Sequence, residues 1–379
     1  MINGKIKIAF LLNNLVGGGA ERVALDVLNN LDRDEFSPFL VLFSKRGEYL
    51  EFLRSDIPVF ELANCNGLRN IFRFNKKLKE LFFYHNPDLV ITYLNSTNRT
   101  LLRLKLFTSF LPPIIVCEQN NLTRNLKRRS NFFLKKLIEW EIRILYAFTE
   151  RILCCSEGIK NDLVNNFKIR RSIFSVIYNP IDLEKITSSI STPTEMERNG
   201  ENEIQIVAVG RLTPQKGFYD LINMFSLLSK EVSAKLIILG EGELRTDLEK
   251  EIYKLGLELN IEMPGFVQNP WTIVKNSDVF VLSSHWEGFG NVIIEAMACE
   301  TPVVSTNCDF GPEEIITDKV NGRLVPVGDI SLMRDAVLEI INKKEIRNRL
   351  ISGGLERVKE FDTTVVVKSY ESLFKDVLI

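Results

Sequence analysis

The stretch from Val279 to Ala296 constrains the fold of this chain more than any other part of the sequence. It starts as an apolar run, passes through a loop with glycines at 288 and 290, and ends in unbroken helix formers. This order is typical of a buried β-strand, a tight loop and the start of a helix. Because the first backbone N–H groups of a helix have no partner inside it, such turns bind anions. We therefore expect a ligand site here.

Two carboxylates mark the same stretch. Glu287 lies in the loop, and Glu295 follows eight residues later. That spacing places Glu295 about two helical turns into the helix and on a similar face. A pair of acids in these positions can hold two sets of hydroxyl groups on an extended ligand. The pair alone leaves a second interpretation open, in which both are ordinary solvated glutamates.

The motifs around these acids resemble a known family. Residues 283–307 read SSHWEGFGNVIIEAMACETPVVSTN, followed by GPEEI at 311–315 and NGRLVPVGD at 321–329. They resemble the donor-binding half of the retaining GT-B glycosyltransferases of family four. Other matching motifs are the glycine loop 17–22, the segment 178–182 and the cations Arg211 and Lys216. The resemblance implies an α/β protein with two Rossmann-like, doubly wound parallel-sheet domains facing a cleft.

The order of apolar and polar segments agrees with that fold class, because strand and helix patterns alternate along the chain. Residues 1–186 are predicted to form an N-terminal acceptor-binding domain, and polar residues 187–203 a linker. Residues 204–363 are predicted to form the nucleotide-sugar-binding domain, and the helix 364–379 to cross back to the first domain. Expected strands are 5–12, 38–44, 59–62, 88–93, 113–118, 151–156, 172–178, 204–210, 235–240, 263–267, 279–284, 302–306 and 322–327.

The resemblance also assigns site residues. It implies catalytic roles for Glu287, Lys216 and Arg211, with the two cations stabilising the leaving diphosphate. It implies an acceptor region at Glu118, Gln119 and Asn120. The donor-binding residues are expected to be Gly18, Gly19, Arg211, Lys216, Gly240, Gly265, Phe266, Val267, Glu287, Gly288, Phe289, Gly290, Asn291, Val292 and Glu295.

One position departs from the family pattern. Relatives often carry His in a segment that reads roughly S-E-H-N, whereas this chain has Gln119 after Glu118. Glutamine can hydrogen-bond a hydroxyl group but cannot take up a proton at neutral pH. The departure leaves the sugar specificity open. His285, close to Glu287, is predicted to be an exposed neighbour and not a catalyst.

We expect no metal and no cofactor beyond the nucleotide-sugar co-substrate. Asp32-Arg33-Asp34 satisfies a bare DxD pattern, but its place at the end of the first helix favours a surface turn. The six cysteines have no CxxC spacing, which argues against a zinc site and agrees with a reducing cytoplasm. The apolar run at 5–12 stops at Asn13, so it is predicted to be a first strand and not a signal peptide.

Charge is distributed unevenly along the chain. Residues 1–180 contain 27 Lys and Arg against 17 Asp and Glu, a net charge of +10, whereas residues 181–379 contain 21 against 32, a net charge of −11. In segments 68–79 and 124–136 basic residues alternate with leucines and aromatics. Such segments suit an anionic membrane surface, although ordinary surface helices remain the alternative. No nucleic-acid-binding motif is present.

The chain is therefore predicted to be a metal-independent retaining glycosyltransferase that moves a sugar, typically a UDP-linked hexose or N-acetylhexosamine, to a lipid-linked or surface-polysaccharide acceptor. Capsule or lipopolysaccharide synthesis at the inner face of the membrane is the expected setting. Two alternatives stay open: a catalytically silent sugar-nucleotide-binding partner of another transferase, and a UDP-sugar epimerase of the same fold.

Overall fold

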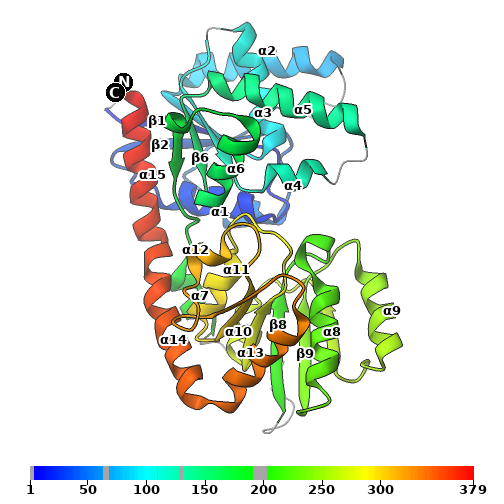
Figure 1. The fold of residues 1–379 in the computed structure, drawn as a ribbon. Coiled ribbons are helices and arrows are strands. Elements are labelled where there is room, and N and C mark those ends of the chain that lie inside the picture. Colours follow the sequence, from blue (N-terminus) through cyan, green and yellow to red (C-terminus); the bar gives the residue numbers. More distant parts are fainter. Residues whose placement is uncertain (1–3, 63–67, 109, 128–130, 191–202) are drawn as a thin grey trace. The chain divides into compact units, whose positions relative to one another are not determined.

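The computed structural model describes residues 4–62, 68–108, 110–127, 131–190 and 203–379. The chain divides into two compact units, one made of residues 1–180 with 363–379 and the other of residues 181–362. Each unit contains one parallel sheet with helices against it (Figure 1). None of the described helices combines the length and the apolarity that crossing a bilayer demands.

The described part of the first unit forms a seven-stranded parallel sheet in the order β3-β2-β1-β4-β5-β6-β7. The order reverses at β1, the point at which doubly wound sheets bind ligands. The strands are β1 (Ile6–Leu12), β2 (Phe36–Leu42), β3 (Val59–Glu61), β4 (Leu89–Tyr93), β5 (Ile114–Glu118), β6 (Arg151–Cys154) and β7 (Phe174–Val176). The helices are α1 (Gly19–Asn30), η1 (Glu48–Phe52), α2 (Leu68–His85), α3 (Asn95–Phe107), α4 (Leu122–Lys127), α5 (Phe132–Leu145), η2 (Tyr146–Phe148), α6 (Glu157–Phe167) and η3 (Arg171–Ile173).

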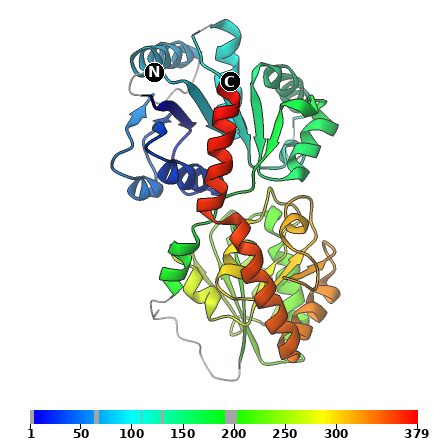
Figure 2. The ribbon, with the colours of Figure 1, turned by 90° about the vertical axis from the view of Figure 1, so that its left-hand side faces the viewer.

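The last helix of the chain, α15 (Thr363–Leu378), belongs to the first unit. It packs beside α1 and lies along the sheet (Figure 2). Phe374 meets Phe10 of β1 edge to face, with 6.3 Å between the ring centroids, and meets Phe36 of β2 at 6.2 Å. Tyr370 is fully buried beside them. Aromatic burial of this size anchors the C-terminus of the chain in the core of the first unit.

The second unit holds a six-stranded parallel sheet among its described residues, in the order β10-β9-β8-β11-β12-β13. The order reverses at β8. The strands are β8 (Ile204–Val209), β9 (Ala234–Leu239), β10 (Ile261–Gly265), β11 (Val279–Leu282), β12 (Val303–Thr306) and β13 (Arg323–Val325). The helices are α7 (Leu183–Ile190), η4 (Pro214–Lys216), α8 (Phe218–Leu228), α9 (Arg245–Leu255), α10 (Trp271–Lys275), α11 (Asn291–Ala298), α12 (Pro312–Ile315), α13 (Ile330–Asn342), α14 (Lys344–Val358) and η5 (Lys359–Phe361).

Strand sequences explain why both sheets are buried. The run Val279–Leu282 is apolar at every position, and all four residues of β11 are buried. Continuous apolar runs of this kind belong to parallel sheets that are covered on both faces. The two doubly wound parallel sheets confirm the predicted fold class. Strand positions also agree, with shifts of at most two residues at the ends, such as β10 at 261–265 against the predicted 263–267.

The boundary between the units lies earlier than predicted. The prediction gave residues 1–186 to the first domain, whereas the first unit ends at Pro180. Helix α7 explains the difference, because its Ile186 is buried and the helix packs against α10 and α11. The predicted linker 187–203 begins inside α7, and its residues 191–202 lie outside the described residues.

Candidate active site

The carboxyl ends of four neighbouring strands meet at one edge of the second sheet. The loops that follow them are hydrogen-bonded to one another: Gly240 donates its N–H to the Gly265 carbonyl at 2.8 Å, and His285 donates to the Gln215 carbonyl at 2.8 Å. Ligands of doubly wound sheets bind at this edge. The residues that the structure gathers there are Arg211, Lys216, Gly240, Gly265, Phe266, Val267, Glu287, Gly288, Phe289, Gly290, Asn291 and Val292.

The central contact at this edge is an ion pair. Lys216 ends η4 after β8, Glu287 follows β11, and the Lys216 Nζ lies 2.6 Å from the Glu287 Oε1. Both side chains are largely buried, with 16% and 8% of their surfaces exposed. Ser284 donates its hydroxyl to the same carboxylate oxygen at 2.6 Å. The carboxylate is therefore fixed in direction by a cation and a hydroxyl, as a group that must orient a ligand requires.

Arg211 differs from Lys216. Its side chain is exposed, and it makes no ion pair or hydrogen bond with another described residue. The prediction had both cations converge on one diphosphate. In this structure Lys216 is bound to Glu287. Of the two predicted cations, Arg211 is therefore the one whose side chain can bind an anion without first breaking an ion pair. The guanidinium also has the fork of donors that suits phosphate oxygens.

The loop before α11 presents backbone and not side chains. The ring of Phe289 is 2% exposed and packs edge to face on Phe361, with centroids 5.6 Å apart. Any contact of Phe289 with a ligand must therefore come from its main chain. Asn291 and Val292 open α11 and are half-buried. The start of a helix carries partial positive charge, which favours an anionic ligand.

The second predicted acid, Glu295, lies inside α11 and is 9% exposed. Its Oε2 accepts a hydrogen bond of 3.2 Å from the indole Nε1 of Trp271, at the start of α10. Sequence reasoning did not identify Trp271. An aromatic residue at the start of a short helix gives no signal of this role, because the contact depends on how α10 packs against α11.

His285 has a partner of its own. Its Nε2 lies 2.8 Å from the Oδ2 of Asp220 on α8. The imidazole therefore contributes to the packing of the loop onto α8, and about two fifths of the side chain is exposed. His285 is thus half-buried and paired, where the prediction was an exposed neighbour, and its lack of a catalytic role stays a prediction.

In the first unit, Glu118 sits at the end of β5 and is 1% exposed. Its Oε1 accepts hydrogen bonds from the Tyr146 hydroxyl, from Asn98 at 2.9 Å and from Asn95 at 3.5 Å. Burial raises the pKa of Glu118 from 4.5 to about 7, although the three donors act in the opposite direction. Gln119 is 8% exposed and Asn120 is exposed, so of the predicted acceptor residues Asn120 offers the most accessible side chain.

The backbone before α3 is strained at Leu94, which has a φ of 72°. A bulky residue in this conformation costs about 1–3 kcal/mol and recurs near functional sites. Here it ends β4 and starts α3 so that Asn95 and Asn98 reach Glu118. Sequence reasoning did not identify these amides or Tyr146 as partners of Glu118.

The glycine loop lies at the switch point of the first sheet, between β1 and α1. Gly18 is the N-cap of α1, and Gly19 is its first residue. The carboxylate of Glu21 folds back over Gly18, within 2.2 Å of where a Cβ would stand. An acid at a helix start is favourable, so an anionic ligand here would have to move the Glu21 side chain aside.

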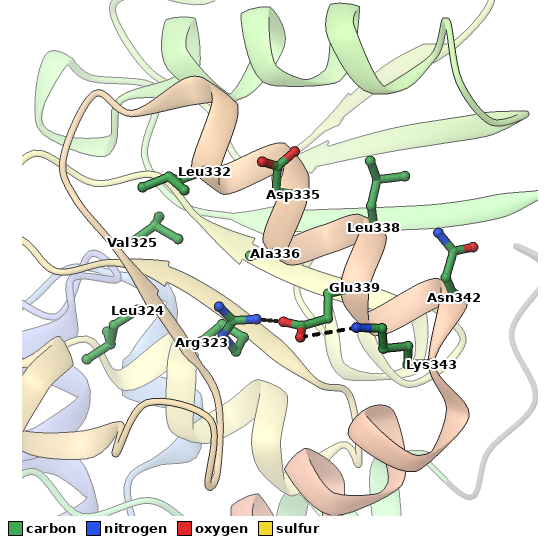
Figure 3. A pocket seen from close by; sticks show the side chains of 10 residues that line it. All are labelled: Arg323, Leu324, Val325, Leu332, Asp335, Ala336, Leu338, Glu339, Asn342 and Lys343. Carbon is green, nitrogen blue, oxygen red and sulfur yellow. Dashed lines mark ion pairs between the residues drawn. The ribbon is translucent and has the colours of Figure 1, made fainter.

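A cavity of about 430 Å³ lies between β13 and α13 (Figure 3). Arg323 and Lys343 both reach Glu339 across it, so its charges compensate one another. None of the predicted site residues lines it. Among the described residues, no group of three or more acidic, His or Cys side chains is arranged to hold a metal ion.

Comparison with protein families gives two matches that together cover most of the chain. Residues 17–185 match the model described as Glycosyltransferase Family 4, and residues 192–357 match the model described as Glycosyl transferases group 1. The first match covers most of the first unit and ends at residue 185, just inside the second unit, and the second match lies within the second unit.

Curated relatives include an enzyme of Campylobacter jejuni named N-acetylgalactosamine-N,N'-diacetylbacillosaminyl-diphospho-undecaprenol 4-alpha-N-acetylgalactosaminyltransferase. It is 29% identical over 368 residues, which cover 96% of this chain and 97% of the relative. The lipopolysaccharide core biosynthesis glycosyltransferase LpsE of Rhizobium meliloti is 30% identical over 252 residues, covering 64% of this chain and 69% of the relative.

Among solved structures, HepE of Anabaena in complex with UDP and glucose superposes with a TM-score of 0.83 at 21% identity, covering 98% of this chain and 99% of HepE. This likeness extends over both units and supports the architecture of two parallel sheets described above.

Proposed function

The chain belongs to the glycosyltransferases of family 4 and group 1, which confirms the family resemblance and the enzyme class, and we propose that it transfers a sugar from a UDP-sugar to a lipid-linked acceptor with retention at the anomeric carbon. The donor is a UDP-linked hexose or N-acetylhexosamine. The Campylobacter jejuni relative is named for a diphospho-undecaprenol acceptor, and HepE was crystallised with UDP and glucose. These names support the acceptor class and the nucleotide that we propose.

The observation that carries the proposal is the ion pair of Lys216 and Glu287 at the edge where β8 and β11 end. As the bond between the sugar and the diphosphate breaks, negative charge grows on the diphosphate and positive charge on the sugar ring. Arg211, Lys216 and the start of α11 stabilise the leaving diphosphate, and electrostatic stabilisation of this kind is usually the largest catalytic contribution. Glu287 faces the developing cationic ring and binds sugar hydroxyls.

The family resemblance suggests the remaining donor contacts that we propose. Glu295, held by Trp271, accepts hydrogen bonds from the ribose hydroxyls. The backbone at Gly265 and Val267 pairs with the base, and the exposed ring of Phe266 borders that position. In the first unit, we propose that residues 118–120 contact the acceptor. No metal or other cofactor is needed, because protein cations neutralise the diphosphate.

The setting that we propose is the inner face of a membrane, in capsule or lipopolysaccharide synthesis. Residues 1–180 carry a net charge of +10, from 27 basic and 17 acidic residues. A basic domain is attracted to the anionic lipids of that leaflet. The lipid-linked acceptor would be reached there.

A donor screen tests this proposal. The purified chain is incubated with UDP-glucose, UDP-galactose, UDP-GlcNAc, UDP-GalNAc or GDP-mannose in EDTA, and both thermal stability and release of the nucleotide are measured. One UDP-sugar should stabilise the protein by a few kcal/mol when present far above its Kd and should be turned over. Turnover that requires added metal would contradict metal independence. Stabilisation without turnover, with or without a diphospho-undecaprenol acceptor, would indicate a silent binding partner.

A further inference from the structure

Helix α5 has two apolar sides, and only one of them packs on the protein. Ile138, Ile142 and Leu145 are buried, and the helix packs against α3 and α6. On the other side, Phe133 is 84% exposed, and the exposed apolar residues continue along the helix to Ile144. We define the outer stripe as Phe133, Leu137, Trp140 and Ile144, which are 84%, 57%, 62% and 37% exposed.

The spacing of the outer stripe makes it one continuous surface. Its members are separated by four, three and four residues, which is the spacing that places side chains one above another on a helix. Singly exposed apolar residues are normal, but a contiguous exposed patch marks a binding surface. Phe107, 86% exposed at the end of α3, adds a further exposed ring on the helix beside α5.

The charges around the outer stripe identify the partner. Lys136 and Arg143 flank it and are exposed. Lys136 forms an ion pair with Glu139 of the same helix at 2.9 Å, and Arg143 donates to the Asn166 carbonyl at 3.0 Å. Glu141, the acid on the opposite flank, is held by both Arg99 and Arg103, and these two guanidinium groups lower its pKa. An apolar stripe whose neighbouring acids Glu139 and Glu141 are both paired with cations, in a segment 1–180 of net charge +10, fits the interface of an anionic bilayer. A second copy of the chain would bring another strongly basic domain against the first, which is unfavourable.

The two basic segments seen in the sequence therefore differ. In segment 68–79, Phe74 and Leu78 are 2% and 0% exposed, so these residues pack as those of an ordinary surface helix do, and the side chains of 68–73 lie outside the described residues. In segment 124–136 the helix start exposes Phe132 and Phe133, while residues 128–130 lie outside the described residues.

We propose that the outer stripe of α5 inserts into the interface of an anionic phospholipid bilayer and holds the first unit against the surface in which the acceptor lies. This inference rests on the proposed lipid-linked acceptor. It adds a hydrophobic anchor to the electrostatic attraction of the basic unit, and Trp140, an aromatic residue suited to the membrane interface, is its centre.

The test compares Phe133→Ser/Leu137→Ser with the wild-type chain on vesicles of phosphatidylglycerol and phosphatidylethanolamine. The wild type should bind, and its tryptophan emission should shift to shorter wavelength, a shift that Trp140→Phe should remove. The Phe133→Ser/Leu137→Ser variant should lose about tenfold or more of its vesicle partition. Leu259→Ser/Tyr253→Ser is the matched control, because these side chains are 95% and 75% exposed in the second unit. The control should bind as the wild type does, and all three proteins should melt at similar temperatures.

Unchanged vesicle binding by Phe133→Ser/Leu137→Ser would overturn the inference. So would a change from dimer to monomer in sedimentation velocity with unchanged vesicle binding, which would make the stripe a contact between copies. Should the variant not fold, Lys136→Glu/Arg143→Glu provides a second test and should also weaken binding to these vesicles.

Activity separates this inference from the proposed function. With an acceptor on a short, water-soluble prenyl chain, wild type and variant should transfer sugar equally well. With the acceptor embedded in vesicles, the variant should be about tenfold slower. Equal rates in vesicles would contradict the membrane anchor and leave the transferase proposal intact. Failure of the wild type with both acceptors would instead contradict the proposed function.

Discussion

The Nζ of Lys216 and the Oε1 of Glu287 lie 2.6 Å apart, although 71 residues separate them in the chain. They meet because β8 and β11 are neighbours in the sheet, so the loops that follow both strands emerge at the same edge. The pair combines opposite tasks in one place. In the proposed mechanism its cation faces the leaving diphosphate, and its acid faces the sugar.

Replacing Glu287 with Gln should lower kcat for transfer by about 100-fold or more, because the neutral amide cannot stabilise positive charge on the sugar ring. The KM for the donor should change less. Steady-state kinetics with the donor found by screening measures this. Glu258→Gln, an exposed glutamate of the same unit, is the control and should be fully active. A variant at Glu287 with wild-type kcat would remove the acid from the mechanism.

Replacing Lys216 with Met should destabilise the second unit, because it leaves the buried Glu287 carboxylate without its cation. We expect a loss of about 3 kcal/mol in the free energy of unfolding. Lys216→Met/Glu287→Gln should lose less than the sum of the two single variants, by about 1–3 kcal/mol. Urea unfolding of the four proteins measures the coupling. Additive losses would mean that the ion pair is not formed in solution.

Much of the fold could be predicted from the sequence because buried parallel strands are continuous apolar runs. Val279–Leu282 is one such run, and its position could be predicted from its four consecutive apolar residues. The position of α7 could not be predicted in the same way. Its polar residues resembled those of a linker. The buried Ile186 shows instead that this segment is a helix of the second unit.

Only part of the candidate site could be predicted from the sequence, because strand positions can be read from it and helix packing cannot. Residues near strand ends, such as Arg211 and Glu287, could be assigned to one edge of the sheet from topology. Their partners could not, because the contacts from Trp271 to Glu295 and from Tyr146 to Glu118 join side chains far apart in the sequence. Such contacts depend on helix packing, which no local pattern encodes.

Replacing Trp271 with Phe should raise the KM for the donor by about tenfold and leave kcat nearly unchanged. Phe lacks the N–H that fixes the direction of the Glu295 carboxylate, and Glu295 is proposed to bind the ribose equally in the ground state and the transition state. Kinetics over a range of donor concentrations measures the effect. Trp140→Phe, on α5 of the first unit, should leave the donor KM unchanged. A fall in kcat alone would place Trp271 elsewhere in the mechanism.

The stability of the chain should depend on pH through Glu118. Burial raises its pKa in the folded protein to about 7, against 4.5 when exposed. Between these values the unfolded chain has lost the proton and the folded chain has kept it, so stability falls as the pH rises through this window. The total loss is about 3 kcal/mol, given a pKa change from 4.5 to about 7.

The stability of Glu118→Gln should not fall over this pH range, because glutamine does not ionise. Its stability relative to the wild type should therefore grow from about pH 4.5 to pH 7 and stay constant above that range. Urea unfolding of both proteins at a series of pH values measures the difference. Parallel stability curves for the two proteins would show that Glu118 ionises normally in the folded state.

Replacing Gly311 with Ala should disturb the loop that carries Glu287. Gly311 has a φ of 93°, and a methyl group there would lie 1.9 Å from the carbonyl oxygen of Phe289. Gly328 has a φ of 78°, but a methyl group on it would meet no atom within 4 Å. Gly328→Ala thus measures the backbone strain alone, about 1–2 kcal/mol, and Gly311→Ala adds the clash with backbone that cannot move aside.

We expect Gly311→Ala to cost about 2 kcal/mol more than Gly328→Ala in the free energy of unfolding. It should also reduce transfer, because shifting Phe289 moves both Glu287 and the start of α11. Urea unfolding and transferase kinetics on the same preparations separate the two effects. Equal costs for the two variants would mean that the loop relaxes freely around Gly311, and the rigid placement of Glu287 would then have to come from Lys216 and Ser284 alone.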